Sequence, residues 1–144
     1  MLRALLWTAA ATTLLTAPAA TAPRSDEDNA MYMRCAKVCA DCQLKCDSCY
    51  KHCLTLVADG QKEHVKTAQY CTDCGEFCRS ASVLTARKSS LSGYMCEGCA
   101  KACDDCATSC ERVPTDAQMA DCAKICRDCA KVCREMTQRV ARDR

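Results

Sequence analysis

The segment CAKVCADCQLKCDSCYKHC, residues 35–53, places its cysteines at alternating intervals of four and three residues. An α-helix turns once every 3.6 residues, so positions three and four apart lie on one face. The spacing therefore predicts a helix that carries a row of thiols along one side. In a soluble bundle that side normally carries large apolar residues. The segment indicates a helical bundle whose interior is lined with sulfur.

The same spacing recurs in three later segments of the chain, which has 144 residues and eighteen cysteines. The candidate ligands in these rows are Cys35, Cys39, Cys42, Cys46, Cys49, Cys53, Cys71, Cys74, Cys78, Cys96, Cys99, Cys103, Cys106, Cys110, Cys122, Cys126, Cys129 and Cys133. Eight C-x3-C pairs can be drawn from this set without sharing a residue. Only Cys71 and Cys96 are left over, and each is the first cysteine of its row.

Turn and capping residues divide the sequence into four predicted helices. They cover approximately 29–58, 61–87, 94–112 and 116–142. Ser25 or Asp28 is the expected cap of the first helix, and Thr115 with Gln118 forms the expected capping box of the last. Short connections between helices of similar length favour antiparallel neighbours. The predicted fold class is all-α, an antiparallel up-down-up-down four-helix bundle with a cysteine-lined core.

The N-terminal 22 residues have the features of an export signal. Arg3 supplies a positive start, residues 4–15 form an apolar run, and Ala17-Pro18-Ala19 offers a cleavage site near residue 19. A membrane anchor is the alternative, although the run is short for a bilayer span. We therefore expect a signal at 1–22, a polar linker at 23–30 and the bundle at 31–144. The mature protein is expected to be exported, periplasmic or secreted, and free of the membrane.

Charge and composition argue against several other classes of protein. The formal net charge is +2, with acidic and basic residues interspersed, which does not indicate a nucleic-acid partner. A thiol-disulfide oxidoreductase would need a distinguished cysteine beside a βαβ pattern, and the sequence has no strand pattern. We predict that the protein is not an enzyme.

Two interpretations of the cysteine rows differ in geometry. Side chains at i and i+4 of a helix have Cβ atoms about 5–6 Å apart, which suits one soft ion held between two sulfurs. A disulfide needs Cβ atoms about 3.5–4.5 Å apart, so bridges within a helix would distort it. Disulfides between helices remain possible. A disulfide-stabilised secreted bundle is therefore the alternative to a metal site.

Soft thiolates select Cu(I), zinc or iron–sulfur clusters. Structural zinc sites are discrete sets of four ligands, and the ferredoxin motif C-x2-C-x2-C-x3-C-P is absent from this sequence. A continuous row favours many ions of low coordination number, and univalent Cu(I) balances thiolate charge at roughly one ion per cysteine. A zinc or mixed-metal thiolate buffer stays open as an alternative.

Softer ligands continue the rows at both ends of the predicted bundle. His64 and Met119 are expected at one end, with Cys53, Cys71, Cys110 and Cys122. Met136 is expected at the other end, with Met31, Met33 and Met95 nearby. Methionine and histidine are reasonable weak ligands for Cu(I), so His64, Met119 and Met136 complete the set of candidate metal ligands. His52 falls off this face and is expected to be solvated.

The repeated C-x3-C and C-x2-C rows on four helices, over about residues 31–136, resemble those of the bacterial copper storage proteins. The resemblance implies Cu(I) storage in the bundle interior, coordination largely by C-x3-C pairs, and histidine or methionine ligands at an open end. It also implies a homotetramer and a copper-requiring enzyme or copper chaperone as recipient. Exported members of the family can carry a twin-arginine signal, whereas this sequence has Arg3 alone.

Overall fold

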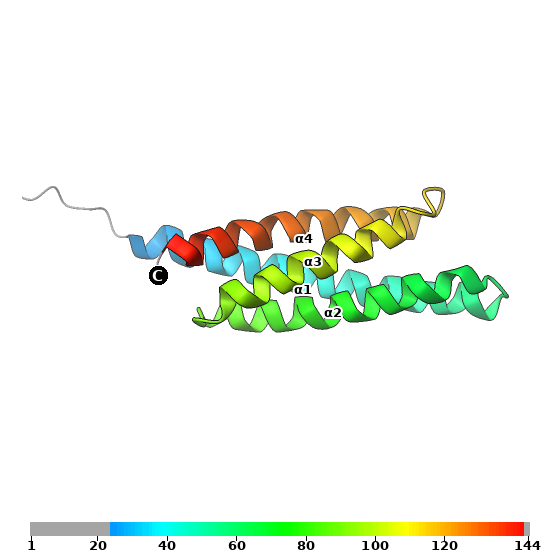
Figure 1. Ribbon diagram of the computed structural model, residues 1–144, viewed down its shortest axis with the longest axis horizontal. Helices are drawn as coiled ribbons and strands as arrows, with labels where there is room; N and C mark the ends of the chain where they lie inside the picture. Colours follow the sequence, from blue (N-terminus) through cyan, green and yellow to red (C-terminus); the bar gives the residue numbers. More distant parts are fainter. Residues whose placement is uncertain (1–23, 143–144) are drawn as a thin grey trace, which may run out of the picture.

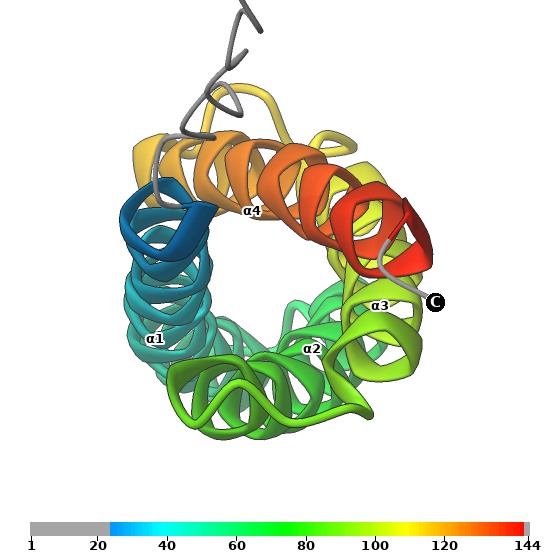
Figure 2. The same cartoon turned by 90° about the vertical axis from the view of Figure 1, so that its left-hand side faces the viewer.

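The structure, a computed structural model, describes residues 24–142 and contains four long helices there (Figure 1). They are α1 Arg24–Ala58, α2 Val65–Ala86, α3 Ser92–Cys110 and α4 Ala117–Arg142, with a 3-10 helix η1 at Lys62–His64. Viewed end-on, the helices form a ring in which α1 neighbours α2 and α4, and α3 neighbours the same two (Figure 2). The predicted all-α four-helix bundle is confirmed. The predicted export signal lies outside the described residues.

Helix α1 begins earlier than the sequence predicted, at Arg24 rather than near residue 29. Most of the predicted linker at 23–30 therefore forms the first turns of α1, and both residues expected to cap the helix lie inside it. Asp26 and Glu27 occupy the first turn, where acidic side chains interact favourably with the helix dipole. Asp28 accepts a hydrogen bond of 2.8 Å from Arg139 of α4, so this extension is held against the bundle.

The start of α4 also differs from the prediction, because Asp116 caps the helix instead of Thr115. Its Oδ1 accepts hydrogen bonds from the backbone N–H groups of Gln118 and Met119, at 2.9 and 3.0 Å. Its Oδ2 lies 2.7 Å from Nε2 of His52 in α1. His52 is therefore half-buried between two helices, and the expectation that it is solvated was wrong. One carboxylate both begins α4 and ties it to α1.

The connection between α1 and α2 follows the predicted stop at Asp59-Gly60. Gly60 has a φ of +93°, in the left-handed region that favours glycine, and it ends the chain's helical path after Ala58. The predicted second helix is divided into η1 and α2. No helix within residues 24–142 combines the length and apolar character needed to cross a bilayer.

The core is built from small side chains. All eighteen cysteines are fully buried, and most of the other buried apolar residues are alanines. Met119 and Met136 are the largest side chains that are completely buried. Small side chains remove little apolar area from water, so each stabilises the fold less than the leucine of an ordinary bundle would. Polar contacts between helices therefore matter more here than in a leucine-filled bundle.

Asp116→Ala should lower the free energy of unfolding of the reduced, metal-free protein by about 1–2 kcal/mol, because it removes both the cap of α4 and the His52 contact. Urea denaturation monitored by circular dichroism measures the change. Asp41→Ala is the matched control, since it removes only the exposed i,i+4 pair with Lys37 and should cost less than about 0.5 kcal/mol. Equal losses in the two variants would contradict the assignment.

The stability lost in Asp116→Ala should depend on pH. Burial opposes ionisation of Asp116, but the His52 contact and the two backbone N–H groups outweigh it and hold the pKa of this carboxyl below its ordinary value. The carboxylate therefore stabilises the fold above its unfolded pKa of about 3.9, and this stabilisation is lost as pH falls through the lower folded value. The difference between wild type and Asp116→Ala should accordingly shrink in acid.

Candidate metal centre

The four helices turn all eighteen thiols toward the bundle axis, as the spacing predicted. We call these side chains the sulfur column. Sulfurs of facing helices lie close together: Cys39 and Cys133 are 3.5 Å apart, and Cys46 and Cys126 are 3.6 Å apart. A disulfide bond is about 2.05 Å long, so these sulfurs are in contact without being bonded. All eighteen cysteines are free thiols, which does not favour the disulfide alternative.

The column contains groups of four sulfurs that all lie within 4.8 Å of one another. Five of these groups are Cys39-Cys99-Cys129-Cys133, Cys42-Cys74-Cys78-Cys103, Cys42-Cys46-Cys74-Cys126, Cys46-Cys106-Cys122-Cys126 and Cys49-Cys71-Cys110-Cys122. Each group takes sulfurs from at least three helices. Several groups also share members, such as Cys42 and Cys74. The last four groups are therefore linked through shared sulfurs, each of which can bridge two ions. Cys99 of the first group lies 3.6 Å from Cys78 and 4.0 Å from Cys103 of the second, so the column is continuous.

Contacts between helices were not visible in the sequence. Cys71 and Cys96, which had no C-x3-C partner, lie 3.7 Å from Cys106 and 3.8 Å from Cys35 on other helices. The C-x3-C pair Cys74–Cys78 has a similar separation of 3.9 Å. Partners across the bundle are thus as near as partners on the same helix. The spacing within one helix cannot reveal them, because it contains no information on how neighbouring helices are aligned.

Protons are shared unequally along the metal-free column. The pKa of Cys103 is raised because its thiol is hydrogen-bonded to neighbouring thiols, first Cys126, and burial adds to the effect. The pKa of its neighbour Cys99 is lowered, because the Cys103 hydrogen bond stabilises its thiolate. Ionising the whole column would place many negative charges in a low-dielectric interior at great cost. Bound cations must therefore replace the protons as the thiols ionise.

The end of the column near the α1–α2 connection combines Cys53 with a histidine. Hydrogen bonds from Cys49 and Cys71 lower the pKa of Cys53 against the opposing effect of burial. His64, in η1, is only 4% exposed. Of the cysteines expected at this end, Cys71, Cys110 and Cys122 form one four-sulfur group with Cys49.

The methionines at the two ends differ in burial. Met119 precedes Cys122 by one helical turn, Met136 follows Cys133 by one turn, and both are fully buried. Met31 and Met95 are partly buried against the core, whereas Met33 is 50% exposed. Met119 and Met136 therefore lie inside the bundle one turn beyond the terminal cysteines of α4, whereas Met33 lies largely at the surface.

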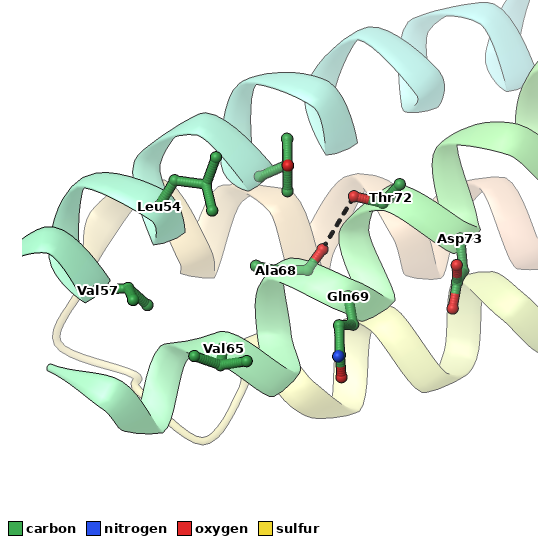
Figure 3. Close-up of a pocket in the computed structure, with 8 residues that line it drawn as sticks. Leu54, Val57, Val65, Ala68, Gln69, Thr72 and Asp73 are labelled. Atoms are coloured by element: carbon green, nitrogen blue, oxygen red, sulfur yellow. Dashed lines mark hydrogen bonds between the residues drawn. The ribbon is translucent and has the colours of Figure 1, made fainter.

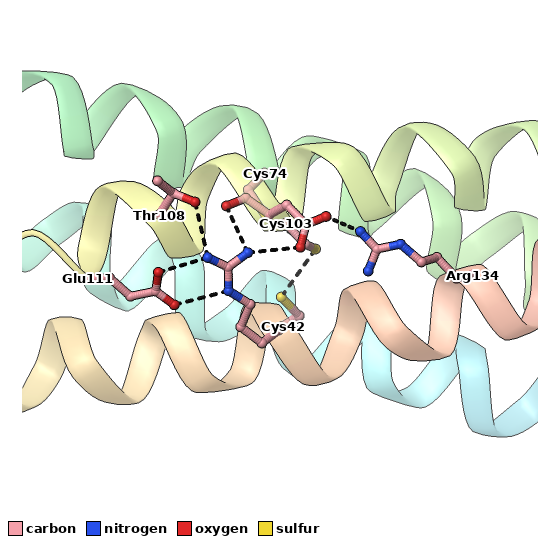
Figure 4. Close-up of polar contacts among 8 residues, drawn as sticks. Cys42, Cys74, Cys103, Thr108, Glu111 and Arg134 are labelled. Atoms are coloured by element: carbon pink, nitrogen blue, oxygen red, sulfur yellow. Dashed lines mark hydrogen bonds and ion pairs between the residues drawn. The ribbon is translucent and has the colours of Figure 1, made fainter.

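Two features outside the column stand apart from the metal centre. A cavity of about 510 Å³ between α1 and α2 is lined by residues that include Leu54, Val65 and Asp73 but no cysteine or histidine (Figure 3). On the outer side of α3 and α4, Arg127 binds Glu111 at 2.8 Å and Asp104 at 3.0 Å, while Cys42 and Cys103 face each other inside at 3.9 Å (Figure 4). The cavity has none of the soft ligands of the column, and the Arg127 ion pairs join α4 to Asp104 of α3 and to Glu111 at its end.

The fold and the column define a class of protein: a helical bundle whose interior is a continuous array of soft-metal ligands. The model of the copper storage protein family matches residues 28–138, and the chain belongs to this family. No curated protein sequence matches the chain significantly.

Solved structures agree with this assignment. The Cu(I)-bound copper storage protein BsCsp3 is 26% identical, with a TM-score of 0.67 over 74% of this chain and 98% of that one. A cytosolic copper storage protein from Streptomyces lividans, in a structure of copper loading with five coppers, is 25% identical, with a TM-score of 0.70 over 78% and 96%. A protein from Nitrosospira multiformis is 29% identical, with a TM-score of 0.65 over 78% and 97%.

The burial of the column predicts how its thiols react. In the native, reduced, metal-free protein, an excess of a chromogenic disulfide reagent should react slowly, because every sulfur is shielded from solvent. In denaturant under anaerobic conditions, all eighteen thiols should react at once. A disulfide-stabilised bundle would instead yield few reactive thiols in denaturant until a reductant is added.

Proposed function

We propose that this protein stores Cu(I) on the cysteine thiolates of its interior and acts as a reservoir or buffer rather than as an enzyme. The continuous sulfur column carries the proposal. Thiolates are soft ligands that favour Cu(I), and a continuous buried row of them is suited to holding many ions. The family assignment and the Cu(I)-bound structural relative support the same function.

The sharing of sulfurs between groups favours Cu(I) over zinc. Zinc takes four ligands in a tetrahedral site, and neighbouring zinc ions would compete for shared residues such as Cys42, Cys46 and Cys74. Cu(I) needs fewer sulfurs per ion, so bridging thiolates can serve ions on both sides. One Cu(I) per thiolate also leaves the buried interior close to neutral, whereas the same number of divalent ions would make it strongly positive.

The proposed ligands are the eighteen cysteines of the column, with His64, Met119 and Met136 as weaker ligands at its ends. The burial of these three side chains and their positions next to the cysteine rows support that role. A thioether or imidazole is neutral and binds Cu(I) without adding charge. Such ligands can therefore accept an ion before thiolates bind it more tightly.

Anaerobic titration with Cu(I) should show uptake of roughly one ion per cysteine, about eighteen in all, with release of protons from the thiols. A colorimetric Cu(I) chelator present in slight excess detects the end point, because it gains colour only after the protein is full. Uptake that ends near four or five ions would favour discrete four-sulfur sites. No uptake by fully reduced protein would refute storage.

Two variants serve as matched comparisons in this titration. Met136→Leu removes a thioether while keeping a similar volume, and it should reduce the capacity by no more than about one ion. Cys42→Ser removes a sulfur shared by two groups and should cost at least as much capacity as the methionine. A larger loss for Met136→Leu than for Cys42→Ser would contradict the proposed ligand ranking.

We further propose an exported, periplasmic or secreted location, a homotetramer, and delivery of copper to a copper-requiring enzyme or copper chaperone. Residues 1–22 support export, and the family resemblance supports the other two. Sedimentation equilibrium tests the tetramer, and copper transfer to an apo-enzyme or apo-chaperone tests the recipient.

Cell fractionation tests the location. The full chain expressed in a bacterium should appear outside the cytoplasm with its N-terminus near residue 20, because the predicted cleavage follows Ala19. A variant lacking residues 2–22 should stay in the cytoplasm. Full-length protein in the membrane fraction would instead favour an N-terminal anchor.

A further inference from the structure

The four interfaces around the ring are not held together in the same way. The α1–α4 interface is crossed by ion pairs along most of its length: Arg139–Asp28, Arg34–Glu135, Lys45–Asp121 and His52–Asp116. The α2–α3 interface has polar contacts near its two ends. Thr67 and Ser109 hydroxyls are 2.9 Å apart at one end, and Ser92 donates to the carbonyl of Leu84 at 3.1 Å at the other.

The middle of the α2–α3 interface contains a cavity of about 290 Å³ whose lining includes one residue of the sulfur column. Cys74 forms part of its wall, although that residue has no exposed surface. Its charged lining residues are Asp73, Asp105 and Lys101. Cys74 is 3.6 Å from Cys103 and belongs to two of the four-sulfur groups. The cavity therefore approaches the column at a member of its central groups, far from either end.

Phe77 covers this region by a contact that depends on a glycine. A Cβ atom added at Gly98 would lie 2.9 Å from Cε1 of the Phe77 ring and 3.3 Å from Cδ1. Only glycine therefore lets the ring lie directly against α3. Phe77 remains 41% exposed. Moving its ring outward therefore costs less free energy than exposing a fully buried phenylalanine would. Exposed side chains change rotamer rapidly, which makes Phe77 a movable cover.

We propose that this cavity is a lateral port through which a small uncharged thiol exchanges Cu(I) with Cys74, with Phe77 as its cover. The inference rests on the proposed copper storage. Soft sulfur of the incoming thiol suits Cu(I). Asp73 and Asp105 outweigh the single positive charge of Lys101, so the lining favours a cation or a neutral ligand over an anionic one. The volume admits a ligand of a few heavy atoms and is below the usual range for larger ones.

The exchange is a ligand substitution without a redox change. The incoming thiol loses its proton and its sulfur forms a bond to Cu(I). The bond between Cu(I) and the Cys74 sulfur breaks, and that sulfur takes up a proton. Copper stays in the +1 state throughout, and one proton is released for each one taken up.

The test measures how fast copper-loaded protein gives Cu(I) to excess bicinchoninate under anaerobic conditions, with and without dithiothreitol as the small uncharged thiol. Bicinchoninate is a large anion and serves as the final acceptor outside the protein. Phe77→Ala should raise the thiol-dependent rate by about fivefold or more, because the cover is gone. Val83→Ala is the matched control, a similarly exposed apolar residue of α2, and should leave the rate unchanged.

A second variant distinguishes exchange through the port from faster copper release caused by a destabilised bundle. Ala102 lines the cavity, and Ala102→Leu should fill it and slow the thiol-dependent rate by about fivefold. A merely destabilised bundle would release copper faster in both variants. Full copper capacity with wild-type exchange rates in both would overturn the port and leave storage intact. Failure of the wild-type protein to take up Cu(I) would overturn storage itself, and the port with it.

Discussion

Contact between sulfurs of facing helices is the constraint on which the rest of this structure depends. Thiols such as Cys39 and Cys133, 3.5 Å apart, meet only when their helices are aligned to within a fraction of a turn. Cysteine and alanine are too small to fix that alignment by interlocking, as leucine does in ordinary bundles. Polar contacts on the outside, such as Arg127 with Asp104 and Asp116 with His52, join the same helices in addition to the sulfur contacts.

Contact between neighbouring sulfurs also determines how readily each thiol of the interior ionises. In the metal-free protein, neighbouring thiols share protons, and a raised pKa at Cys103 accompanies a lowered one at Cys99. Each thiolate makes the ionisation of its neighbours more costly, because like charges repel in the buried interior. A univalent ion that replaces a proton preserves this balance at every level of the column. Metal binding and folding are therefore coupled, since the loaded interior gains bonds that the small side chains alone do not provide.

The sequence predicted features that depend on one helix at a time. The 35–53 spacing identified the buried face, and Asp59-Gly60 identified the end of α1. Features that depend on two helices were missed: the extension of α1 that Asp28 anchors on α4, the use of Asp116 as the cap, and the pairing of His52. The four-sulfur groups belong to the second kind. Cys71 and Cys96 had no partner along their own helices, and their neighbours became visible only when the helices were placed side by side.

The length of the column creates a problem of access. From Cys35 to Cys53, α1 rises by about 27 Å, so an ion at the centre is more than 10 Å from either end. Movement along the axis requires successive exchanges between shared sulfurs, and filled neighbouring sites block each exchange. Ions at the centre would therefore be the last to leave a full column by its ends. The α2–α3 interface, with its polar contacts near the ends and the Phe77–Gly98 contact between them, is where the ring offers a shorter path. A store that must both fill completely and empty on demand gains most from access at that level, because removing one central ion frees sites for its neighbours on both sides.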